Sequence, residues 1–150
     1  MSKVQHYKNL NSNLEKIYEI IKDTINEEHN LKIVSEYKGL LNSVPLRSIM
    51  AINNSPKVIV GSLREIHVSI TGEPNDYAIE VASGAWFGSL LFPGVAGLVI
   101  GGPIGLAAGA TVGVIMAYEF EKKIWKKIIE AIKRESERHP TIDSIDHYYQ

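Results

Sequence analysis

The feature that most constrains this chain is a long run without charge. From Val81 to Tyr118 the sequence contains no Asp, Glu, Lys, Arg or His. About 20 apolar residues cross the roughly 30 Å hydrocarbon core of a bilayer as one helix, and ordinary buried helices are about half that length. The run is too long for one straight crossing and suits two short helices. It therefore predicts either a membrane or a very apolar protein interior around it.

Glycine and proline indicate where the run turns. Gly101-Gly102-Pro103 is the natural turn, because Gly ends a helix in the left-handed conformation and Pro suits the first turn of the next helix. Pro93-Gly94 is an alternative break. With the later turn, limbs 84–100 and 104–118 would measure roughly 25 and 22 Å at 1.5 Å per residue. Both are short for a full crossing, so a re-entrant or oblique hairpin and a spanning hairpin both stay open.

A regular ladder of glycines predicts how this hairpin packs. The glycines that stand four residues apart are Gly97, Gly101, Gly105, Gly109 and Gly113. This spacing puts them on nearly one helix face, where the missing side chains let another backbone approach closely, as helices do in lipid. In water each would weaken a helix interior by up to about 1 kcal/mol relative to Ala. We predict a helix-packing surface and self-association; the alternative is a hairpin packed inside a soluble protein or oligomer.

The first part of the chain predicts a helix. Ser12-Asn13-Leu14-Glu15 fits a capping box, in which the Ser12 hydroxyl and the Glu15 carboxylate bind backbone N–H groups at a helix start. The apolar residues that follow at helical spacing are Leu14, Ile17, Tyr18, Ile21 and Ile25. We expect this amphipathic helix to end near His29-Asn30 and to pack on a sheet.

From Leu31 the apolar residues begin to alternate with polar ones, which is typical of strands. We predict strands at 31–37, 46–52, 57–71 and 77–82, with turns at 53–56 and 72–76. In the third strand Ile66, Val68 and Ile70 point one way and Glu65, His67 and Ser69 the other, and Glu65 and His67 are expected on solvated surface. The predicted fold is α+β: an N-terminal amphipathic helix packed on an antiparallel sheet of about four strands. A glycine-rich apolar helical hairpin follows and runs into a long C-terminal amphipathic helix.

The predicted organisation has four parts without linkers. They are a small α+β domain (1–82), the glycine-rich apolar helical hairpin (83–118), a charged amphipathic helix (119–139) and a polar, mobile tail (140–150). In the charged helix the predicted membrane-interface residues are Lys122, Lys123, Trp125, Lys126 and Lys127. A Trp at headgroup depth and Lys beside anionic lipid form such an anchor. The alternative is a solvated helix that covers part of the sheet.

Composition and motifs indicate no catalytic site and no binding site for a metal, a cofactor or nucleic acid. The net charge of -1 and the pI near 6.5 give no general attraction to nucleic acid, and without Cys there is no disulfide or thiol nucleophile. The glycine-rich run lacks the Lys-Ser/Thr pair of a phosphate-binding loop, and there is no His-Glu-x-x-His or Gly-x-Ser-x-Gly motif. Asp143, Asp146 and His147 are expected on solvated surface. We therefore expect no catalytic residue, cofactor or metal ligand, and no N-terminal signal peptide.

These patterns together predict a non-enzymatic, membrane-associated protein on the cytoplasmic side of a membrane. Its glycine-zipper hairpin would insert into or lie on the lipid bilayer and self-associate as a homo-oligomer, in anchoring, assembly or permeabilisation. One alternative is a cytoplasmic soluble structural oligomer, such as a shell or virion component, with the hairpin buried between subunits. The other is a small lipid-binding protein whose sheet and helices enclose an acyl chain.

Overall fold

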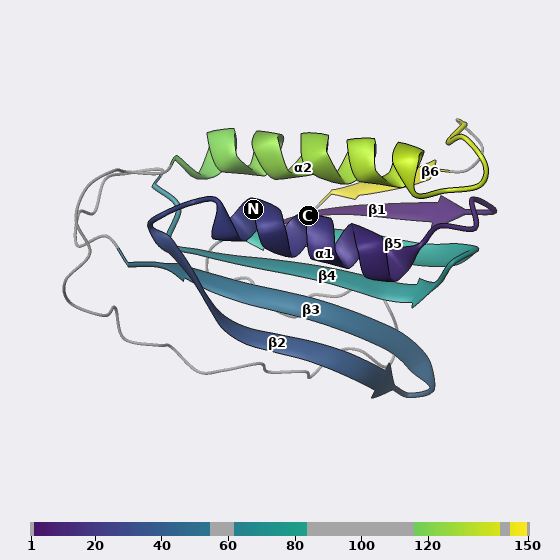
Figure 1. The fold of residues 1–150 in the computed structure, drawn as a ribbon, viewed down its shortest axis with the longest axis horizontal. Coiled ribbons are helices and arrows are strands. Elements are labelled where there is room, and N and C mark those ends of the chain that lie inside the picture. Colours follow the sequence, from purple (N-terminus) through teal and green to yellow (C-terminus); the bar gives the residue numbers. More distant parts are fainter. Residues whose placement is uncertain (1, 55–61, 84–115, 142–144, 150) are drawn as a thin grey trace.

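The computed structural model describes residues 2–54, 62–83, 116–141 and 145–149. The predicted hairpin, with Gly97, Gly101, Gly105, Gly109 and Gly113, lies almost entirely outside these residues. The described elements are β1 (Ser2–Lys8), α1 (Leu14–Asn26), β2 (Leu31–Leu41), β3 (Val44–Asn53), β4 (Glu65–Glu73), β5 (Asp76–Ser83), α2 (Ala117–Arg134) and β6 (Ile145–Tyr149). The strands pair antiparallel in the order β2-β3-β4-β5-β1-β6 (Figure 1). The α+β class and the antiparallel sheet are thus confirmed.

The described sheet has six strands where the sequence predicted about four. The two additional strands, β1 and β6, come from the ends of the chain, and β1 pairs with both β5 and β6. The expectation of a mobile tail was wrong for Ile145–Tyr149, which form the edge strand. These short segments have little apolar alternation of their own, so their strand conformation depends on the ladder hydrogen bonds that β5 offers to β1, and β1 to β6.

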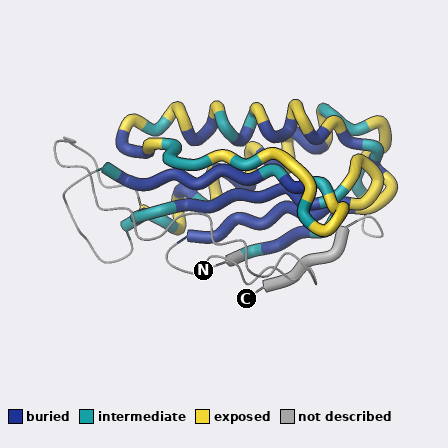
Figure 2. The backbone as a smooth tube through the Cα atoms, turned by 90° about the horizontal axis from the view of Figure 1, so that it is seen from below, coloured by how far each residue is buried: buried dark blue, intermediate teal, exposed yellow. Residues whose placement is uncertain are grey.

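The two helices lie side by side over one face of the sheet (Figure 1). α1 packs against β2, β3 and β4, and α2 packs against α1 and β5. Each helix buries one apolar stripe and exposes its opposite side, as Figure 2 shows. The buried stripe of α1 is Leu14, Ile17, Tyr18, Ile21, Thr24 and Ile25, and that of α2 is Phe120, Ile124, Trp125, Ile128, Ala131 and Ile132. Burial of these apolar stripes is the main stabilising term of the fold.

The helix start at α1 is one residue later than predicted. Asn13 is the N-cap, and its side-chain oxygen accepts a hydrogen bond from the backbone N–H of Lys16 at 3.2 Å. The Ser12 hydroxyl is buried and bonds instead to the hydroxyls of Tyr77 at 2.7 Å and Ser136 at 2.6 Å. Because the fold brings these distant hydroxyls together, Ser12 ties the start of α1 to β5 and to the end of α2.

The C-terminal helix also ends earlier than the predicted residue 139. α2 ends at Arg134, with Glu135 as C-cap. The following backbone pairs with the segment before α1: Asn13 N–H donates to Glu135 C=O at 2.8 Å, and Arg138 N–H donates to Leu10 C=O at 3.2 Å. These bonds satisfy backbone groups that a longer helix would have used internally.

The β4–β5 hairpin turns more tightly than the predicted loop at 72–76. Glu73 pairs with Asp76, which leaves only Pro74 and Asn75 in the turn, and Gly72 beside it has φ of 119°. A Cβ at Gly72 would lie 2.2 Å from the backbone oxygen of Asp76. Both the positive φ and this close approach require glycine.

Gly72→Ala is therefore expected to lower the free energy of unfolding by about 2–3 kcal/mol, because the backbone must move to admit the methyl group. Urea denaturation followed by circular dichroism measures this change. Gly39→Ala is the control, because its Cβ would meet only the end of the Tyr37 side chain, at 2.8 Å from the hydroxyl oxygen. If both variants unfold at the same urea concentration, the strain at Gly72 is not as described.

Candidate functional site

The two ends of the uncharged run meet at one end of the sheet. Ser83 is the last residue of β5, and its hydroxyl donates a hydrogen bond to the carboxylate of Glu121 in the first turns of α2. Met116, just before α2, bridges to Ser62, and Ser83 pairs with Ile66 near the start of β4. The chain therefore leaves the described fold at Ser83 and returns at Met116 on the same side, the left in Figure 1.

Exposed apolar and aromatic side chains lie where the chain returns. Met116 and Tyr118 are 41% and 63% exposed. The Lys122 ammonium lies 5.2 Å from the centre of the Tyr118 ring, which is within cation–π range. Sequence reasoning treated Tyr118 only as the end of the run. Its spacing from Lys122, about one helical turn, was the signal that it shares a surface with the lysines.

The structure separates the five predicted membrane-interface residues into two groups. Lys122, Lys123, Lys126 and Lys127 are exposed on α2, whereas Trp125 is only 6% exposed and belongs to the core cluster. The Lys3 ammonium of β1 lies 4.8 Å from the centre of the Trp125 ring. Trp125 thus packs between α2 and the sheet, and the role of the five residues at a membrane surface stays a prediction.

One of the four lysines is engaged with the neighbouring helix end. The Lys123 ammonium forms a 2.6 Å ion pair with the carboxylate of Glu28, just after α1. This contact assigns Lys123 to the flank of α2 that faces α1. Lys122, which contacts Tyr118, lies on the other flank. Periodicity in the sequence could not make this distinction, because it does not say on which side α1 lies.

The sheet face opposite the helices carries a buried polar row. Ser48 pairs with Ser69, and Ser69 pairs with Glu80, across β3, β4 and β5. All three are 2% exposed, and His67 on the same face of β4 is 7% exposed. The expectation that His67 lies on solvated surface was wrong. Strand alternation predicted correctly which side chains share this face, but burial of both faces of a sheet cannot be read from alternation.

This row has residue types that occur in the active sites of hydrolases. Burial lowers the pKa of His67 to about 4, which makes its imidazole a weak base at neutral pH. The Ser69 hydroxyl has no hydrogen-bond partner in the structure as described, although an activated nucleophile requires a bond to its base. Nor does the described part of the chain contain a cluster of three or more His, Asp or Glu side chains that could hold a metal ion. As described, the Ser69 hydroxyl is therefore not paired with a base that would activate it.

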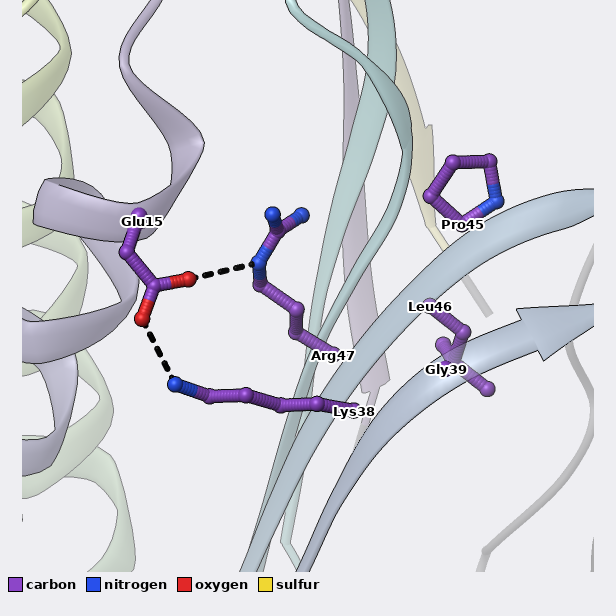
Figure 3. A pocket seen from close by; sticks show the side chains of 6 residues that line it. All are labelled: Glu15, Lys38, Gly39, Pro45, Leu46 and Arg47. Atoms are coloured by element: carbon purple, nitrogen blue, oxygen red, sulfur yellow. Dashed lines mark hydrogen bonds and ion pairs between the residues drawn. The ribbon is translucent and has the colours of Figure 1, made fainter.

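A small hollow of about 110 Å³ lies between α1 and the β2–β3 hairpin (Figure 3). The Glu15 carboxylate there accepts hydrogen bonds from Lys38 Nζ at 2.6 Å and Arg47 Nε at 3.2 Å (Figure 3). The hydrogen bond from Lys38, together with that from Arg47, lowers the pKa of Glu15. Because the carboxylate is paired on both oxygens and half exposed, the cluster fastens α1 to the hairpin weakly.

Comparison with known proteins adds no relative. No protein family model, no curated protein and no solved structure matches this chain. Of the helices in the described residues, none combines the length and the apolar character needed to cross a membrane.

Proposed function

We propose that this is a non-enzymatic, membrane-associated protein in which residues 83–118 form a glycine-zipper hairpin that inserts into or lies on a bilayer and self-associates. The observation that carries the proposal is the closed geometry at the ends of the uncharged run. The hydrogen bond between Ser83 and Glu121 joins the strand before the run to the helix after it. A segment with both ends at one place can enter a bilayer as a hairpin while the folded part stays on one side.

The charges beside this junction support an orientation. The exposed lysines Lys122, Lys123, Lys126 and Lys127 lie within the first turns of α2, close to the point where the chain returns. Positive charge next to a membrane segment favours the cytoplasmic side, and exposed aromatic side chains such as Tyr118 favour headgroup depth. We therefore propose that the α+β part lies on the cytoplasmic face of a membrane, with the hairpin as its anchor and as the contact between copies.

Flotation of the full chain with lipid vesicles tests this proposal. The protein is expected to rise with vesicles in a density gradient and to form cross-linked oligomers in them. Gly109→Leu should still float but should lower the oligomer fraction by about tenfold or more, because a leucine on the glycine face forces the helices apart. Ala108→Leu is the matched control, since position 108 lies about 100° away on a helix.

Protein that stays at the bottom of the gradient and purifies without detergent as a monomer would contradict the proposal. A large, stable, water-soluble assembly that Gly109→Leu breaks would instead favour the structural oligomer. An acyl-chain adduct in native mass spectrometry of the purified monomer would favour the lipid-binding alternative. All of these measurements use the same purified preparation of the protein.

A further inference from the structure

One flank of α2 carries basic and apolar side chains without an acidic one. Tyr118, Lys122, Lys126, Ile129 and Lys133 recur at the spacing of helical turns, so they form one stripe along the helix. All five are exposed, Tyr118 at 63% and Ile129 at 37%. The stripe is about 22 Å long at 1.5 Å per residue. We name these five residues the basic flank.

The basic flank faces away from α1. Lys123 marks the opposite flank, because its ammonium bonds to Glu28 beside α1 at 2.6 Å. Trp125, next to the basic flank on the helix, is covered by Lys3 of β1, which adds a further cation on this side of the molecule. Of the acidic residues of α2, Glu121 is hydrogen-bonded to Ser83 at the junction, and Glu119 and Glu130 border the stripe, three residues before Lys122 and four after Lys126.

Charge is distributed unevenly over the whole molecule. α2 holds six basic and three acidic side chains, although the chain has a net charge of -1. The exposed side of α1 carries Glu15, Glu19 and Asp23 beside Lys16, and Lys38 pairs with both Glu15 and Glu19. An anionic surface would therefore attract the α2 side more strongly than the α1 side.

We infer that the basic flank lies flat on the anionic headgroups of the membrane, and this inference rests on the proposed function. Lysines at such a surface attract acidic lipid, and Tyr118 and Ile129 reach the boundary between headgroups and acyl chains. The flank begins at the junction where the uncharged run returns to the fold. A single orientation of the molecule therefore lets the uncharged run enter the bilayer and the basic flank touch the bilayer surface. The apolar stripe of α2 stays in the protein core, and the helix therefore rests on the surface without inserting.

Site-specific fluorescence tests which side of the molecule meets the bilayer. The chain contains no Cys, so Ile129→Cys and Asp23→Cys each create a single labelling site, one on the basic flank and one on α1. Labelled with an environment-sensitive dye, the Ile129→Cys protein is expected to shift its emission to the blue on addition of vesicles made of phosphatidylcholine and phosphatidylserine. The Asp23→Cys protein should not change. Equal responses at the two sites, or a response only at position 23, would overturn the inference.

Charge reversal tests the electrostatic part. Each lysine near an anionic surface contributes about fivefold to binding, so the double variant Lys122→Glu with Lys126→Glu should lower the vesicle partition coefficient at least about 30-fold. The control, Lys16→Glu with Lys32→Glu, changes the net charge equally at exposed positions on α1 and β2, away from α2, and should retain more of the binding. Circular dichroism verifies that all variants fold.

The outcomes separate the two proposals. Wild-type protein that floats with no vesicle, anionic or zwitterionic, removes the proposed function. If the wild-type protein floats and both double variants bind vesicles as well as the wild type does, only the basic flank is excluded as the contact surface. Binding that is lost equally in both double variants also overturns the inference, because net charge alone would then explain it.

Discussion

Trp125→Ala is expected to lower the free energy of unfolding by about 3–5 kcal/mol in buffer without any lipid. The indole is 6% exposed and belongs to the core cluster between α2 and the sheet, so its removal leaves a large cavity. This loss is a large fraction of the stability of a typical domain. Equilibrium denaturation in urea measures it, and the variant is expected to unfold at a much lower denaturant concentration or to fold incompletely.

Tyr118→Ala is the matched comparison on the same helix. Tyr118 is 63% exposed, so its removal should change stability by no more than about 0.5 kcal/mol. It should weaken vesicle binding instead, because its ring belongs to the basic flank. If Trp125→Ala keeps full stability and loses only vesicle binding, Trp125 acts at the membrane surface and its packing in the core is not what stabilises the fold.

The second large effect concerns acid. His67 has its pKa lowered by burial to about 4 in the folded protein, against a reference value of 6.5. Above about pH 6.5 the imidazole is neutral in both the folded and the unfolded state. Folding then releases no proton from His67, and His67 makes no contribution to the pH dependence of stability. Between pH 6.5 and 4 the unfolded chain binds a proton that the folded chain does not, and the free energy of unfolding falls as pH falls. Over this pH range the free energy of unfolding falls by about 3 kcal/mol in total, at about 1.36 kcal/mol per pH unit.

His67→Gln removes this titration and keeps a polar side chain at the position. The variant is expected to lose about 3 kcal/mol less stability than wild type between about pH 7 and pH 4, measured by urea denaturation at each pH. Glu15, whose pKa is lowered by the hydrogen bond from Lys38, also contributes stability that disappears in acid, but it does so equally in both proteins. The contribution of Glu15 therefore cancels in the difference between the two proteins. Parallel curves for wild type and variant would show that His67 does not resist protonation in the folded state.

Acid sensitivity of this size would affect the vesicle-binding experiments. A fold that loses about 3 kcal/mol near pH 4 opens more readily there. Vesicle binding should therefore be measured at neutral pH, where the α+β part has its full stability. At that pH, binding reports the basic flank of an intact fold.

Periodicity predicted the interior elements of the fold well. α1 follows the helical pattern of apolar residues and β3 and β5 follow the alternating one, and these three elements are present close to the predicted place. These patterns work because a helix or strand must turn its apolar side to the same core along its whole length. The ends of the elements were less accurate. Ser12 and the residues after Arg134 make hydrogen bonds to partners that are far away along the chain, and these bonds override the local capping signals.

The third predicted strand is the element whose start differs most from its expected place. The sequence predicted a strand from position 57, whereas β4 begins at Glu65. Positions 57–61 of the predicted strand lie outside the described residues. Before β4, the Arg64 carbonyl accepts a hydrogen bond from Asn53 N–H at 2.7 Å, and the Leu63 carbonyl accepts one from the Asn53 side chain at 2.8 Å. These bonds to the end of β3 hold the chain just before the strand begins.

The candidate site was predicted only in part. The lysines of α2 lie on the surface as a charged helix face requires, but Trp125 was assigned to that surface from its position beside them, and it lies in the core. An amphipathic helix carries aromatic residues equally well on its buried side and at its edge. Tyr118 was missed for the same reason, because its exposure depends on where α1 and the sheet lie relative to α2.

The order of residues alone established the uncharged run, the glycine ladder, the α+β class and the concentration of lysine in the last helix. All of these depend on neighbours along the chain, within a few turns. The pairing of β1 and β6, the burial of His67, the meeting of Ser83 with Glu121 and the choice of an outward flank on α2 required the folded molecule. The reason is physical: each depends on contacts between segments that are distant in the sequence, whose geometry is set by the packing of the whole core and not by local conformational preference.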